Sequence, residues 1–107
     1  MTATEFRRLA LDLSGAVEAA HMGHPDFRVG GKIFATLGYP RAGFGVVMLT
    51  PEQQALFVRA EPKTFAPVPG GWGRQGSTRV MLRTAKKSAV REALKVAWSN
   101  RAPARKK

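Results

Sequence analysis

Apolar residues recur at helical spacing in three stretches of the chain. The predicted helices cover residues 2–13, 50–60 and 86–100. Thr2 and Glu5 fit a capping box at the start of the first helix, and Thr50 and Gln53 fit one at the start of the second. Ser14-Gly15 should end the first helix. The last helix should bury Val90, Leu94, Ala97 and Trp98.

Shorter apolar stretches between these helices predict strands. The expected strands cover residues 17–22, 27–29, 32–37, 45–49, 65–68 and 77–83. His24-Pro25-Asp26 should form the turn between the first two strands. The run at 45–49 is continuously apolar, which is typical of a central strand covered on both faces, and it should pair antiparallel with 32–37. Pro67 favours a sheet edge for the strand that contains it.

Two of these strands alternate between two kinds of side chain. In the first, the sets are Ile33, Ala35 and Leu37 against Lys32, Phe34 and Thr36. In the second, they are Thr78, Val80 and Leu82 against Arg79, Met81 and Arg83. Such alternation places one set on the core side of a sheet. The glycine-rich stretch 69–76 before the second strand is expected to be a turn.

Length and composition indicate one globular domain. The chain has 107 residues, of which 44% are hydrophobic and 23% charged. We expect a single domain over residues 1–100 and a disordered basic tail over 101–107. Cysteine is absent, and the sequence contains neither a signal-peptide core nor an apolar run long enough to span a bilayer. A cytoplasmic location without membrane contact is therefore expected.

The net charge of +11 arises in the second half of the chain. Residues 1–61 contain 6 basic and 6 acidic side chains, whereas residues 62–107 contain 12 basic and 1 acidic. Such an excess favours a polyanionic partner, because each cation that meets a phosphate releases a condensed counterion. A merely solvated basic surface is the alternative.

Residues 21–37, with the sequence HMGHPDFRVGGKIFATL, resemble the MmcQ/YjbR family. The similarity continues through Leu49-Thr50-Pro51-Glu52, Trp72-Gly73 and the closing helix, and so covers nearly the whole chain. The resemblance implies an α+β fold in two layers, an antiparallel sheet flanked by helices in the order α-β3-α-β2-α, similar to the CyaY-like or secretion-chaperone-like arrangement. It also implies DNA binding through a double-wing surface of sheet hairpins.

Glycines at 71–76 spell G-x-G-x-x-G, but they do not predict a nucleotide cofactor. A dinucleotide fingerprint follows a strand and opens a helix, whereas here a strand follows the glycines. Two interpretations stay open. Backbone amides and Arg74 contact a phosphate while Trp72 stacks on a base, or Trp72 packs at the core edge of a tight hairpin.

Metal binding and catalysis have little support in the sequence. His21, His24 and Asp26 are of ligand type, but two imidazoles three residues apart on a strand and turn need not converge, so turn chemistry explains them better. The chain contains no nucleophile elbow and no P-loop. We expect no metal, no cofactor and no catalytic residue.

A group of basic residues, together with one tryptophan, is the expected binding surface. Its members are Lys32, Trp72, Arg74, Arg79, Arg83, Lys87, Arg91 and Lys95. The alternative is a charged strand and a charged helix that point different ways, because the last helix packs by its apolar face. We expect a nonenzymatic DNA-binding protein that contacts mainly phosphates through a basic sheet-wing surface. A protein-interaction or chaperone-like adaptor is the alternative function.

Overall fold

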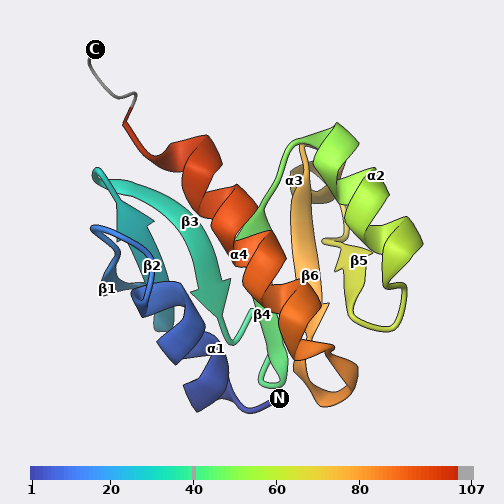
Figure 1. Cartoon of the computed structure of the whole chain (residues 1–107), viewed down its shortest axis with the longest axis horizontal. Coiled ribbons are helices and arrows are strands. Elements are labelled where there is room, and N and C mark those ends of the chain that lie inside the picture. Colours follow the sequence, from blue (N-terminus) through green and yellow to red (C-terminus); the bar gives the residue numbers. More distant parts are fainter. Residues whose placement is uncertain (40, 104–107) are drawn as a thin grey trace.

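One antiparallel sheet carries the long helices of the chain on the same face (Figure 1). The computed structural model describes residues 1–39 and 41–103. The helices are α1 (Ala3–Leu11), α2 (Pro51–Ala60), the four-residue α3 (Gly71–Arg74) and α4 (Lys87–Arg101), with a 3-10 turn η1 (Leu82–Thr84). The strands are β1 (Val17–His21), β2 (His24–Val29), β3 (Lys32–Leu37), β4 (Phe44–Met48), β5 (Phe65–Pro67) and β6 (Ser77–Met81).

The strands lie in the order β1-β2-β3-β4-β6-β5, and each neighbouring pair is antiparallel. This confirms the mixed α+β class, the central place of β4 and the edge position of β5. The order of elements expected from the family resemblance is wrong in two respects. The short helix α3 lies between β5 and β6, which were expected to follow one another directly. Four strands precede α2, not three, because β1 and β2 form a separate hairpin outside the β3–β4 pair.

Both predicted capping boxes are present. At the start of α1, Thr2 Oγ1 accepts a hydrogen bond from the Glu5 amide at 3.0 Å, and Glu5 Oε1 accepts one from the Thr2 amide at 2.8 Å. The bond from the Thr2 backbone lowers the pKa of Glu5. Thr50 and Gln53 make the same reciprocal bonds in α2. Helix α1 ends at Leu11, two residues earlier than expected, whereas α2 has its expected end.

The turn of the first hairpin lies two residues before its expected position. Met22 and Gly23 both have positive φ angles, +51° and +81°, as a tight two-residue hairpin turn requires. His21 and His24 are therefore the last cross-strand pair of the hairpin. Pro25 and Asp26, expected in the turn, belong to β2 instead. Asp26 is consequently a strand residue with a defined face.

A bulge changes the expected faces of β3. Phe27 pairs with Ala35 but Arg28 pairs with Ile33, so Phe34 is an additional residue in the ladder. Phe34 is completely buried in the core, which corrects its placement with Lys32 and Thr36. Ile33 lies outside the core cluster. The bulge thus separates it from Ala35, its expected neighbour on one face.

The stretch 69–76, expected to be a turn, contains the short helix α3 at Gly71–Arg74. Gly73 and Gly76 permit this path, because a Cβ on Gly73 would lie 1.7 Å from Val68 O and one on Gly76 would lie 2.0 Å from Leu49 O. Gln54 Nε2 donates to the carbonyl oxygens of Gly73 and Ser77, at 3.0 Å each. These bonds from α2 hold α3 at the start of β6.

Helix α4 packs its apolar face on β3 and β4 and ends later than expected. Its fully buried side chains are Val90, Ala93, Leu94 and Ala97. Trp98 is half-buried and donates its indole N–H to Ser14 O at 2.8 Å. The expected tail begins within this helix: Arg101 is its last residue, and Pro103 lies against Gly30. Residues 104–107, the rest of that tail, lie outside the described residues.

Candidate nucleic-acid interface

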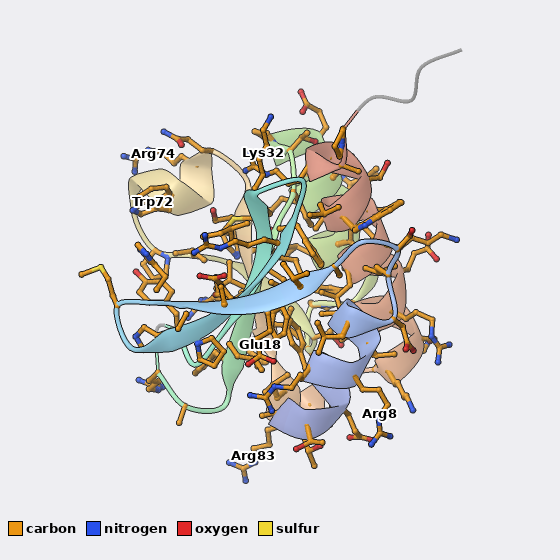
Figure 2. The ribbon with its side chains drawn as sticks, turned by 90° about the vertical axis from the view of Figure 1, so that its left-hand side faces the viewer. Arg8, Glu18, Lys32, Trp72, Arg74 and Arg83 are labelled. Atoms are coloured by element: carbon orange, nitrogen blue, oxygen red, sulfur yellow. The ribbon has the colours of Figure 1, made fainter. Side chains whose placement is uncertain are left out.

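One face of the sheet is left uncovered by α1, α2 and α4. In the view along the sheet, α1 and α4 lie on one side and α3 lies on the other (Figure 2). A row of cross-strand partners faces the uncovered side: Asp26, Thr36, Val46 and Arg79. Their sequence neighbours Phe27, Ala35, Val47 and Thr78 are completely buried on the helical side. We call the uncovered side the open face.

A buried ion pair lies on the open face. Arg28 Nε donates to Asp26 Oδ1 at 2.8 Å, and the terminal Nη2 of Arg28 donates to Asp26 Oδ2 at 3.1 Å. The Asp26 side chain is 0% exposed, whereas that of Arg28 is 33% exposed. This fork-like hydrogen bonding raises the pKa of Arg28, so that its guanidinium stays charged. The pair therefore has one buried end and one end at the surface.

Beside this pair the open face has a cavity of about 480 Å³, which we call the apolar pocket. Its walls come from three places: the β1–β2 hairpin tip with Met22, the central strands with Val46 and Met48, and α3 with Trp72. Asp26 and Thr36 also line it. A pocket of this size and apolar lining falls in the range of small-ligand sites, which is roughly 300–1,000 Å³.

A second cavity, of about 460 Å³, adjoins the first, and we call it the cationic hollow. Arg28, Lys32 and Arg101 line it, together with Trp72 and Gln75. The two cavities share four lining residues: Ile33, Met48, Trp72 and Ser77. Ion pairs in the described part of the chain are Arg7–Glu18, Arg28–Asp26 and Lys86–Glu61. Lys32 and Arg101 thus have no carboxylate partner among those residues.

Three expected site residues gather at this end of the open face. Lys32, Trp72 and Arg74 lie toward one end of the sheet, whereas Arg83 lies toward the other (Figure 2). Trp72 is 67% exposed, so it does not pack at the core edge, and that interpretation is wrong. Its neighbour Gly73 is buried instead. The short helix therefore presents the indole outward.

Arg79 lies on the open face but is already engaged within the protein. Its Nε donates to Pro67 O at 3.1 Å, and its guanidinium carbon lies 5.8 Å from the centre of the Phe44 ring. Arg41 approaches the same ring, at 5.3 Å. Arg83 was expected on the same strand face, but β6 ends at Met81 and Arg83 belongs to η1. These two arginines therefore do not form a strand stripe.

The basic stripe of the last helix belongs to the other layer. Lys87, Arg91 and Lys95 are exposed along α4, whose opposite side packs on the helical face of the sheet. One continuous surface through Arg79 and this stripe is therefore not formed. The two sets point different ways because α4 is oriented by its apolar positions.

The last three amides of the glycine motif are engaged within its short helix, and the histidines do not form a metal site with other described residues. The amides of Arg74, Gln75 and Gly76 donate to carbonyl oxygens of residues 70–73, so they do not face a phosphate. His21 and His24 face each other across the hairpin, and the His24 ring meets Tyr39 edge-on at 6.2 Å. Within residues 1–39 and 41–103, no group of three or more His, Cys, Asp or Glu side chains could hold a metal ion.

Three residues that line the two cavities were missed from the sequence. Asp26 and Arg28 are two apart, which on a strand places them on the same face, but the turn assigned to His24-Pro25-Asp26 hid this signal. Arg101 was assigned to the tail. Its position one turn after Ala97, directly beyond the predicted end of the last helix, was the available indication.

The fold and the open face define a class: a two-layer α+β protein with a six-stranded antiparallel sheet, one face of which is exposed. The family model YjbR matches residues 11–100, and the chain belongs to this family.

Among solved structures, the crystal structure of Deinococcus radiodurans protein DR2400, with a DUF419 domain, is similar. It is 18% identical with a TM-score of 0.72, and the match covers 91% of this chain and 75% of that one. No curated protein matches this sequence. No helix among the described residues has the length and apolarity needed to cross a membrane.

Proposed function

We propose that this protein binds nucleic acid, with DNA as the favoured partner, and catalyses no reaction. The observation that carries the proposal is the group of cations at one end of the sheet: Lys32 and Arg101 line the cationic hollow with the exposed Trp72, and Arg74 lies in the same short helix as Trp72. Cations next to an outward-facing indole suit a phosphate backbone with adjacent bases. The net charge of +11 adds long-range attraction for a polyanion.

The open face also suggests which parts act as the two wings expected from the family resemblance. The tip of the β1–β2 hairpin, with Met22 84% exposed, borders the apolar pocket on one side. The segment with α3 borders it on another. We propose that these two projections flank the bound strand, and that Arg41 and Arg79 around Phe44 extend its path over the sheet.

The proposal is tested by salt-dependent binding. Fluorescence anisotropy is measured with labelled duplex and single-stranded oligonucleotides at several salt concentrations. Phosphate binding predicts a linear fall of log affinity with log salt, with a slope of about −0.9 per bound phosphate on B-form DNA and about −0.7 on single strands. A chain ending at Pro103 is the control, because it removes Arg105, Lys106 and Lys107, whose charges alone can attract a polyanion. Absence of binding to every oligonucleotide at low salt would contradict the proposal.

An adaptor for other proteins is the second candidate function, and the apolar pocket with exposed Met22 and Trp72 favours it. It accords with the CyaY-like or secretion-chaperone-like arrangement that we propose for this fold, although fold alone is weak support for a function. The salt dependence of binding distinguishes the two candidate functions. Docking of an apolar segment should depend little on salt, whereas phosphate binding should weaken steeply.

A further inference from the structure

Trp72 forms a wall common to the apolar pocket and the cationic hollow. No aromatic ring in the described part of the chain stacks on its indole. A ligand that fills both cavities needs a flat apolar part next to an anion. A nucleotide has this composition, since its base is planar and its phosphate is charged.

The floor of the apolar pocket carries polar groups suited to the edge of a base. Thr36 Oγ1 is buried and has no hydrogen-bond partner among the described residues. A buried hydroxyl without a partner is destabilising, and the cavity that Thr36 lines has room for a ligand group that could supply one. The Asp26 carboxylate also lines this pocket and accepts two bonds from Arg28. Base edges present both donors and acceptors.

The charge of the cationic hollow suits one phosphate group at the mouth of this pocket. Lys32 and Arg101 have no carboxylate partner among the described residues, so their charge is not neutralised there. The Arg28 guanidinium is engaged by Asp26, and its charge is offset by that carboxylate. The hollow therefore has an excess of two positive charges beside Trp72.

We propose that the apolar pocket takes one unpaired base of a nucleic-acid strand, stacked on Trp72, while an adjoining phosphate of the strand lies in the cationic hollow. This inference rests on the proposed function and makes it more specific. Bases inside a duplex are stacked and paired, so they do not offer a face to Trp72 without being extruded. The protein therefore prefers single strands, or duplexes with an unpaired base, over perfect duplexes.

The test uses the full chain and four labelled ligands of equal length: a single strand, its duplex, a duplex with one unpaired central base, and a single strand without bases. Anisotropy is measured at one moderate salt concentration. We expect the normal single strand and the bulged duplex to bind about tenfold more tightly than the perfect duplex and the abasic strand, from the usual contribution of one stacked base. Trp72→Ala should remove most of this difference, and Trp72→Phe should keep most of it.

Leu56→Ala is the matched control, because Leu56 is another exposed apolar side chain, 64% exposed, on the helical side. It should leave all four affinities unchanged. Circular dichroism checks that each variant is folded. If all four ligands bind equally, or if Trp72→Ala keeps the wild-type preference, the base pocket is refuted while phosphate binding stands. If no ligand binds at low salt, the proposed function fails and the base pocket with it.

Discussion

Arg28 holds the carboxylate of Asp26 from the same face of β2 through two hydrogen bonds, of 2.8 and 3.1 Å. The two residues are not equivalent, because Asp26 is wholly buried and Arg28 reaches the surface. Removing Arg28 should therefore change the free energy of unfolding by a different amount than removing Asp26. The buried carboxylate depends on its partner more than the guanidinium does.

Arg28→Met should consequently destabilise the fold more than Asp26→Asn. We expect the larger loss for Arg28→Met, because it leaves the buried Asp26 carboxylate without its partner. Asp26→Asn should cost about 1 kcal/mol, since the freed guanidinium turns to water. Urea denaturation measures both, and the double variant should recover part of the larger loss. Equal losses for the two single variants would contradict this asymmetry.

Leu94→Ala should open a cavity between α4 and the sheet. Leu94 is completely buried in the core, and truncation of such a leucine costs about 2 to 4 kcal/mol. Leu56→Ala makes the same chemical change at an exposed position and should stay within about 0.5 kcal/mol. Chemical denaturation compares the two variants. Similar losses at both positions would mean that α4 does not pack on the sheet by this face.

Thr50→Ala should weaken the start of α2. The Thr50 hydroxyl accepts a bond from the Gln53 amide at 3.2 Å, and loss of such a cap costs about 1 kcal/mol. Thr50→Ser keeps the hydroxyl and should restore most of the stability. Nucleic-acid affinity should not change, because α2 lies on the helical side of the sheet (Figure 1). A stability of Thr50→Ala equal to that of the wild type would exclude a capping role.

Two charge-matched double variants compare the cationic hollow with the exposed side of α4. Lys32→Gln with Arg101→Gln removes two positive charges from the cationic hollow, and Lys87→Gln with Arg91→Gln removes two from the exposed side of α4. The first pair should lower affinity and reduce the salt slope by roughly 0.7 to 0.9 for each phosphate that is no longer neutralised. The second pair should leave the slope unchanged. Anisotropy measured over a salt titration gives the slope for each double variant. A lower slope for the Lys87 and Arg91 variant alone would place the interface on the helical side.

Elements with local signals were predictable from the sequence. Thr2 and Thr50 indicate the starts of their helices because a cap is satisfied within one turn of backbone. The apolar run of β4 predicted its central place in the sheet, but the expected cover on both faces is wrong, because Val46 lines the pocket on the open face. Composition alone determined the charge and its concentration in the second half. These properties need no knowledge of distant contacts.

Other features were decided only by tertiary structure. The bulge at Phe34 depends on how β3 pairs with β2, and the alternation of β3 alone did not reveal it. Because α4 packs on the helical face of the sheet, Arg91 lies in the helical layer, whereas Arg79 lies on the open face. Trp72 faces outward because Gly73 fits closely against Val68, leaving no room for a side chain there. Which residues share a surface is set by long-range packing of apolar faces, and a linear pattern of charges does not contain that information.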